Sequence, residues 1–89
     1  MNFAIVGATG NVGRKTINIL EKYKLRVDNL FLVASKKSSG KKISFKNKKI
    51  KIIALEDYDF SKAQITFFAA GSNIAKKWAP IAAKKTIVI

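Results

Sequence analysis

The chain has 89 residues, 48% of them hydrophobic, and a formal net charge of +13. This length allows one small domain, and no apolar run reaches the roughly 20 residues that a membrane helix needs. The lack of Cys and His excludes a disulfide framework, a thiolate nucleophile and the common zinc ligands among these residues, and it favours a cytoplasmic protein.

The positive charge comes almost entirely from lysine, because Arg14 and Arg26 are the only arginines among the 18 basic residues. Nucleic-acid-binding proteins typically use arginine and exposed aromatic side chains, whereas these lysines are spread over every expected element. We interpret the charge as compositional bias. A basic nucleic-acid-binding module stays open as an alternative, and its affinity would fall steeply with salt.

The first strand is expected over residues 3–6, which are entirely apolar, as in a central parallel strand. Three glycines follow, and a helix is expected after them. Five residues at helical spacing are assigned to its inward face: Val12, Thr16, Ile19, Leu20 and Tyr23.

A second apolar strand is expected over residues 30–34, followed by a polar loop. The segments at 42–45 and 48–55 alternate, and together they predict a hairpin joined at residues 46–48. Residues 56–62 predict an acidic turn or a single helical turn. Its carboxylates are interpreted as a solvated cap rather than an acid–base pair or a metal site: Glu56, Asp57 and Asp59.

The last third predicts a strand over residues 64–70 and a helix with Ser72 or Asn73 as its N-cap. Pro80 is expected to kink or break that helix. Its apolar face is assigned to four residues, with the tryptophan in the core: Ile74, Trp78, Ile81 and Ala82. With a final strand at 86–89, the alternation predicts an α/β fold, a Rossmann-like parallel sheet with flanking helices.

The turn after the first strand has the spacing G-x-x-G-x-x-G, with Gly7, Gly10 and Gly13. In such a motif the first glycine allows a sharp turn, the second lets a pyrophosphate approach the backbone, and the third allows close helix–strand packing. Free N–H groups of the helix point at the phosphate, and Thr9 and Asn11 add donors. The alternative is a tight turn with no ligand.

The end of the second strand indicates which dinucleotide would bind. NAD-preferring sites usually have an acid there to hold the ribose 2′-OH, but Asp28 precedes the strand and so lies at the opposite end of the sheet. The end that faces the glycines reads Ser35-Lys36-Lys37-Ser38, whose cations and hydroxyls suit a 2′-phosphate. The sequence therefore predicts NADP rather than NAD, with a solvated lysine loop as the alternative.

Three segments together resemble the aspartate-semialdehyde dehydrogenases: "VGATGNVGR" at 6–14, "LVASKKSSGKK" at 32–42 and "DFSKAQITFFAAGSNIAKKWAP" at 59–80. Their order and spacing fit, and the resemblance covers essentially the whole chain. It implies an oxidoreductase that uses NADPH to reduce L-aspartyl 4-phosphate to aspartate semialdehyde, in the biosynthesis of lysine, methionine and threonine.

The resemblance also implies roles for particular residues. Beside Gly7, which makes the turn, the pyrophosphate would be held by Thr9, Gly10, Asn11 and Val12. The adenosine 2′-phosphate would be held by Ser35, Lys37 and Ser38, with Lys37 where the family usually has Arg, which loses the bidentate fork but keeps the charge. Ala70 and Gly71 would border the nicotinamide.

The family's nucleophilic Cys, general-base His and substrate-binding Arg residues have no counterpart in these 89 residues, and thioester chemistry needs a thiolate. We therefore expect residues 1–89 to be part of an NADP-binding domain, without the catalytic and dimerisation domain and inactive alone. The substrate would bind only with the catalytic half, and the interface of the homo-oligomeric family would be largely absent. Other NADP-binding families and a poorly folding remnant stay open.

Overall fold

A computed structural model describes residues 1–23 and 26–89. Its main sheet has five strands, every neighbouring pair of which is parallel, in the order β5-β2-β1-β6-β7. The strands are β1 (Asn2–Val6), β2 (Asn29–Ala34), β5 (Ile53–Ala54), β6 (Ile65–Phe68) and β7 (Ile87–Val88). This arrangement is the Rossmann-like α/β fold predicted from the alternation of elements.

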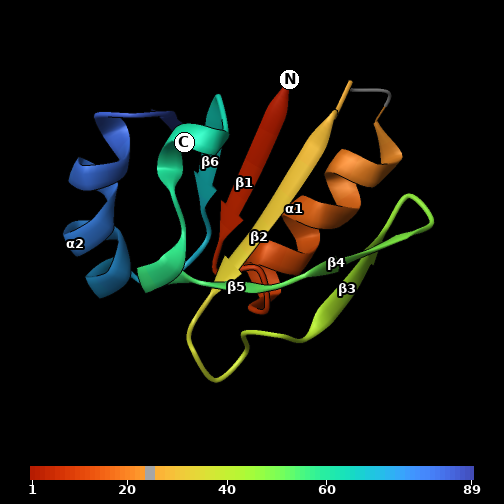
Figure 1. Ribbon diagram of the computed structural model, residues 1–89, viewed down its shortest axis with the longest axis horizontal. Coiled ribbons are helices and arrows are strands. Elements are labelled where there is room, and N and C mark those ends of the chain that lie inside the picture. Colours follow the sequence, from red (N-terminus) through yellow and green to blue (C-terminus); the bar gives the residue numbers. More distant parts are fainter. Residues whose placement is uncertain (24–25) are drawn as a thin grey trace.

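The two faces of the sheet are covered by different parts of the chain (Figure 1). One face carries α1 (Asn11–Lys22) and a hairpin of β3 (Lys42–Phe45) and β4 (Lys48–Lys51). The other carries α2 (Ser72–Ala83) and the short 3₁₀ helices η1 (Leu55–Asp57) and η2 (Phe60–Lys62). The sheet is therefore the middle of three layers.

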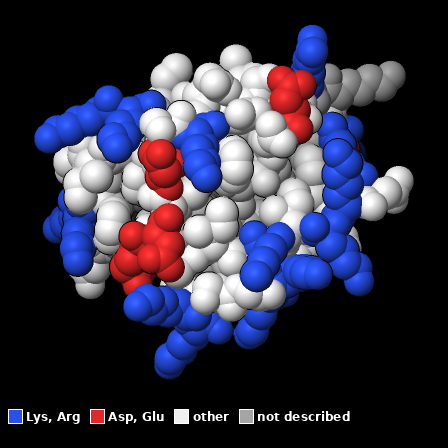
Figure 2. All heavy atoms as spheres, in the orientation of Figure 1, with Lys and Arg blue, Asp and Glu red and all other residues white. Residues whose placement is uncertain are grey.

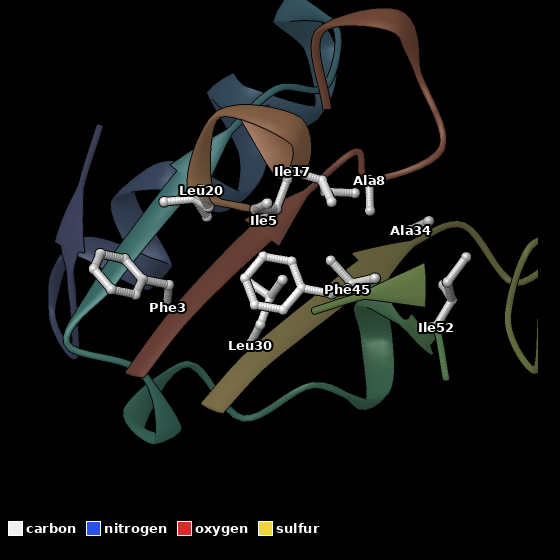
Figure 3. Close-up of a cluster of buried hydrophobic side chains, with 10 residues drawn as sticks. Phe3, Ile5, Ala8, Ile17, Leu20, Leu30, Ala34, Phe45 and Ile52 are labelled. Atoms are coloured by element: carbon white, nitrogen blue, oxygen red, sulfur yellow. The ribbon is translucent and has the colours of Figure 1, made fainter. Parts of the chain in front are cut away.

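Successive residues of β1 point to opposite faces, so one strand supplies both cores. Phe3 and Ile5 belong to the core under α1 (Figure 3), and Ala4 and Val6 to the core under α2. The first core also takes apolar side chains from α1, β2 and the hairpin, including Ile17, Leu20, Leu30, Phe45 and Ile52. This two-sided burial explains why the strand is apolar throughout.

The predicted inward face of α1 was right only in part. Leu20 is buried and Thr16 partly buried, as predicted. Val12, Ile19 and Tyr23 are 61%, 51% and 60% exposed, and the helix buries Gly13 and Ile17 in their place. A Cβ at residue 13 would lie 2.1 Å from the Gly7 carbonyl oxygen. The missing side chain thus lets this side of the helix lie directly on the turn after β1, which decides the face that turns inward.

The hairpin is confirmed, with a two-residue turn at Lys46 and Asn47. Both have positive φ, 46° and 67°, as a turn that matches the twist of a hairpin requires. The Lys46 N–H also donates to Glu21 Oε2 at 2.9 Å, which ties the turn to α1. The sequence did not indicate that the chain then re-enters the main sheet as β5, beside β2.

Helix α2 begins at Ser72 with Gly71 as its N-cap and no capping side chain, so the prediction of a Ser72 or Asn73 cap was wrong. The assigned helix continues past Pro80 to Ala83, so the proline does not break it. Of the residues assigned to its apolar face, Ala82 is buried and Trp78 partly buried, whereas Ile74 and Ile81 are 39% and 46% exposed.

Strand β1 lies between β2 and β6, and the connections to these two neighbours cross opposite faces of the sheet. The loops that follow β1 and β6 therefore diverge at the carboxyl edge of the strands. In open α/β sheets, a crevice for ligands forms at this point.

Candidate nucleotide-binding site

A cavity of about 640 Å³ lies at the carboxyl edge of the main sheet, where the loops diverge. Its lining comes from the end of β1 and the turn after it, the end of β2, the residues that follow β5 and β6, and the first half of α2. Six of the ten residues predicted to bind cofactor line it: Gly7, Thr9, Gly10, Ser35, Ala70 and Gly71. The other four, Asn11, Val12, Lys37 and Ser38, are not part of its wall.

Gly7 makes the floor of the cavity possible. Its φ of +87° suits glycine, and a Cβ there would lie 2.7 Å from the backbone nitrogen of Ala70. The Gly7 N–H donates to the Val33 carbonyl at 2.8 Å, and the Ala69 N–H donates to the Val6 carbonyl at 2.8 Å. The turn after β1 is thus held against both neighbouring strands, with no room for a side chain.

Gly10 differs because the fold does not require a glycine there. Its φ of −77° and ψ of 171° are open to any residue, and a Cβ would meet only the Gly7 carbonyl oxygen, at an ordinary 3.5 Å. Gly10 nonetheless lines the cavity. The missing side chain therefore leaves space at the N-terminus of α1 that a larger residue would fill.

The N-terminus of α1 suits an anion. Gly10 is its N-cap, with no capping side chain, and its first turn has no acidic residue. The first N–H groups of a helix lack partners within the helix, and its dipole favours negative charge there. Asn11 and Val12, in that first turn, are exposed beside the cavity rather than in its wall. These features fit the pyrophosphate of a dinucleotide.

The loop after β2 is a compact turn rather than an open strand end. The Ser38 N–H donates to the Ser35 carbonyl at 3.0 Å, and Ser39 Oγ donates to the Lys36 carbonyl at 2.8 Å. Ser35 lines the cavity, and Lys36 and Lys37 are exposed. The loop thus carries two exposed lysines and several hydroxyls directly after Ser35, the last residue of this segment that lines the cavity.

Asp28 lies at the amino end of β2, as the sequence predicted. Its carboxylate pairs with the Met1 ammonium and accepts a hydrogen bond from Arg26 Nε at 3.3 Å. The hydrogen bond to the Met1 ammonium lowers the pKa of Asp28, with Arg26 adding to the effect. The carboxylate is therefore occupied at the edge opposite to the cavity.

The wall formed by α2 was not recognised from the sequence. Asn73, Ile74, Lys77 and Trp78 line the cavity, and Lys77 Nζ lies 5.6 Å from the centre of the Trp78 ring. Trp78 also packs against Phe60, with ring centres 6.3 Å apart. It is therefore both a partly buried core residue and part of the wall. The spacing of these four residues places them on one side of a helix, and this pattern could have indicated the wall from the sequence.

Two residues that follow β5 also line the cavity, Leu55 and Glu56. The three acidic residues of this segment are exposed, as the interpretation as a solvated cap requires, but only Asp59 caps a helix. Asp59 accepts hydrogen bonds from the Ser61 N–H at 2.9 Å and Ser61 Oγ at 2.7 Å, which caps η2. Glu56 instead belongs to the cavity. Recognising 53–54 as a strand of the main sheet would have placed Glu56 at the carboxyl edge.

Tyr58 lies in the core under α2, in contact with other aromatic rings. Burial raises the pKa of its hydroxyl to about 12, and the charge of Asp59 adds to the effect. Within residues 1–23 and 26–89, its hydroxyl has no hydrogen-bond partner. Tyr58 is therefore a buried neutral phenol.

Lysine and arginine side chains are distributed around the rim of the face in Figure 2, with acidic and uncharged residues between them. They do not merge into one patch on this face, as a nucleic-acid-binding surface would. Among the residues that the structure describes, no helix has the length and apolar character needed to cross a membrane.

Comparison with known proteins identifies relatives along the whole chain. Residues 2–89 match the family model described as semialdehyde dehydrogenase, NAD binding domain. The aspartate-semialdehyde dehydrogenase of Rickettsia bellii is 46% identical over 99% of this chain and 26% of its own length. That of Shewanella violacea is 44% identical over the same shares. The chain thus spans about a quarter of the length of these relatives.

Solved structures agree with the sequence comparison. The crystal structure of aspartate semialdehyde dehydrogenase II from Vibrio cholerae, complexed with ASA, matches with a TM-score of 0.94 and 42% identity. The match covers 98% of this chain and 29% of that one. A probable aspartate-semialdehyde dehydrogenase from Pseudomonas aeruginosa matches with a TM-score of 0.93 and 31% identity, over 99% and 27%. The chain therefore belongs to the semialdehyde dehydrogenase family, as a domain that binds a nicotinamide dinucleotide.

Proposed function

We propose that residues 1–89 form part of the NADP(H)-binding domain of an aspartate-semialdehyde dehydrogenase. The cofactor would lie along the cavity at the carboxyl edge of the sheet, with its pyrophosphate at the N-terminus of α1. The proposed binding residues are Gly7, Thr9, Gly10, Asn11, Val12, Ser35, Lys37, Ser38, Ala70 and Gly71.

The observation that carries this proposal is the space at Gly10. Its backbone angles permit any residue, and the protein itself leaves room for a Cβ. A glycine there is explained if a ligand approaches the backbone closely, as a pyrophosphate does in dinucleotide sites. The uncapped N-terminus of α1 supports the same position for the phosphates.

The preference for NADP(H) over NAD(H) is supported by the loop after β2. Asp28 lies at the opposite edge of the sheet, where it pairs with the Met1 ammonium. The loop directly after β2 contains lysines and serines and no acidic residue. Hydrogen bonds between charged groups contribute about 1.5 to 3 kcal/mol each, which favours the cofactor with a 2′-phosphate.

For a complete enzyme that contains this domain, we propose the NADPH-dependent reduction of L-aspartyl 4-phosphate to aspartate semialdehyde and phosphate. The 89 residues contain no Cys and no His. They offer neither a thiolate for a covalent step nor an imidazole as a base. The activity proposed for these residues alone is therefore cofactor binding, with catalytic groups and substrate contacts from outside them.

A fluorescence titration tests the proposal. Trp78 is the only tryptophan of the chain and lines the cavity, so bound reduced cofactor should quench its emission by energy transfer. We expect saturable quenching by NADPH at lower concentration than by NADH. Failure of a cooperatively folded chain to bind either one contradicts the proposal. Tighter binding of NADH contradicts the preference.

A further inference from the structure

Glu56 lies in the wall of the cavity, next to the end of β2 and the loop proposed to bind the adenosine 2′-phosphate. Ala34 and Ala54 are registered partners and the last residues of β2 and β5. Ser35 and Leu55 therefore leave the sheet side by side, on strands about 4.8 Å apart, and Glu56 follows directly. Ser35, Leu55 and Glu56 all line the cavity.

The carboxylate of Glu56 is not engaged elsewhere. Three of the five acidic side chains have partners in the structure: Glu21, Asp28 and Asp59. Within residues 1–23 and 26–89, Glu56 and Asp57 form no hydrogen bond or ion pair with their side chains, and Glu56 alone among the five acids lines the cavity. The cavity thus has one free negative charge, close to the loop that carries Lys36 and Lys37.

We propose that Glu56 is a specificity-determining residue that weakens binding of the 2′-phosphorylated cofactor and so limits the preference for NADP(H). The inference rests on the proposed function. The lysines of the loop attract a 2′-phosphate, and the carboxylate on the adjoining strand end repels it. NAD(H), which lacks the 2′-phosphate, is attracted less by the lysines and repelled less by the carboxylate. Opposing charges of this kind set specificity by penalising one ligand relative to another.

The test compares Glu56→Gln with Asp57→Asn. Both substitutions remove one negative charge from η1 and keep the size of the side chain, but Asp57 does not line the cavity. Each variant of residues 1–89 is titrated with NADPH and NADH by Trp78 fluorescence, and folding is checked by thermal unfolding. We expect Glu56→Gln to tighten NADPH binding by roughly three- to tenfold and to leave NADH within about twofold. Asp57→Asn should change neither by more than about twofold.

The salt dependence gives a second readout. The Debye length falls from about 10 Å at 0.1 M to about 3 Å at 1 M salt, so the advantage of Glu56→Gln for NADPH should shrink as salt rises. If Glu56→Gln behaves like Asp57→Asn, Glu56 has no role in specificity and the inference is wrong. If Glu56→Gln weakens NADPH and NADH binding equally, Glu56 contacts a part that both cofactors share, and the inference is also wrong. If the unmutated chain binds neither cofactor, the proposed function fails and the inference fails with it.

Discussion

A Cβ at residue 13 would lie 2.1 Å from the carbonyl oxygen of Gly7, closer than any real side-chain carbon approaches backbone oxygen. Gly13 is thus the contact through which α1 rests on the turn after β1. Replacing it with Ala must push the helix away from the strand. We expect Gly13→Ala to lower the free energy of unfolding by about 3 kcal/mol or more, measured by urea denaturation.

Gly10→Ala is the matched control, because its Cβ would meet only an ordinary contact at 3.5 Å. Its expected cost is about 1 kcal/mol or less, from the poorer N-cap. A small domain has about 5 to 10 kcal/mol in total, so the two variants should be clearly separated. Similar losses would show that Gly13 is not the tight contact.

Gly10→Val should abolish binding of both NADPH and NADH while the fold persists. The backbone angles of Gly10 accept a β-branched residue, but the added side chain would occupy the space proposed for the pyrophosphate. Fluorescence titration measures the binding, and circular dichroism with thermal unfolding checks the fold. Unchanged affinity in a folded variant would remove the glycine turn from the site.

Lys37→Glu should weaken NADPH binding by roughly 10- to 100-fold, because a charged hydrogen bond to phosphate contributes about 1.5 to 3 kcal/mol. NADH binding should change far less. Lys49→Glu makes the same change of charge on an exposed residue of β4 outside the cavity wall, and should affect both cofactors little. Equal losses for NADPH and NADH in Lys37→Glu would remove the 2′-phosphate assignment.

Tyr58→Phe should leave the stability at pH 7 unchanged or raise it by about 1 kcal/mol, since the buried hydroxyl has no partner in the described structure. The pKa of Tyr58 is raised from 10.0 to about 12 by burial. The unfolded chain therefore loses this proton first, and the protein loses stability as the pH rises from about 10 to 12.

Phe has no such proton, so Tyr58→Phe should be the more stable of the two proteins at pH 11. All other ionisable groups are common to both proteins, so the difference between the two urea curves isolates Tyr58. A parallel pH dependence in both proteins would show that this phenol does not titrate differently in the folded state.

The sheet and its connections could be predicted because the strands are apolar runs and the turns carry strong signals, such as the glycines after β1. The inward face of α1 could not be predicted by counting apolar residues. Leu20 is buried as predicted, but Val12, Ile19 and Tyr23 are exposed, and Ile17, which was not predicted, is buried. The close backbone contact at Gly13 decides which face turns inward. The spacing of apolar residues cannot reveal this contact, because it depends on the absence of a side chain at Gly13.

The glycine turn after β1 was predictable because its residues are adjacent in sequence and their spacing has a physical meaning; its role in binding phosphate stays a prediction. The opposite wall was not. Lys77 and Trp78 reach the cavity through the three-dimensional path of α2, more than 60 positions after Gly10. The place of Glu56 in the cavity wall could not be predicted, because β5 has only two residues, too few to show a strand pattern.

Strand β7 is the last in the sheet order and pairs only with β6 on one side within the described residues. Its Ile87 is 63% exposed. An open apolar edge is a template on which another strand can add, and it is opposed here by the mutual repulsion of molecules that each carry +13. Screening by salt weakens this repulsion, so residues 1–89 on their own should associate along β7 more readily at high salt than at low salt.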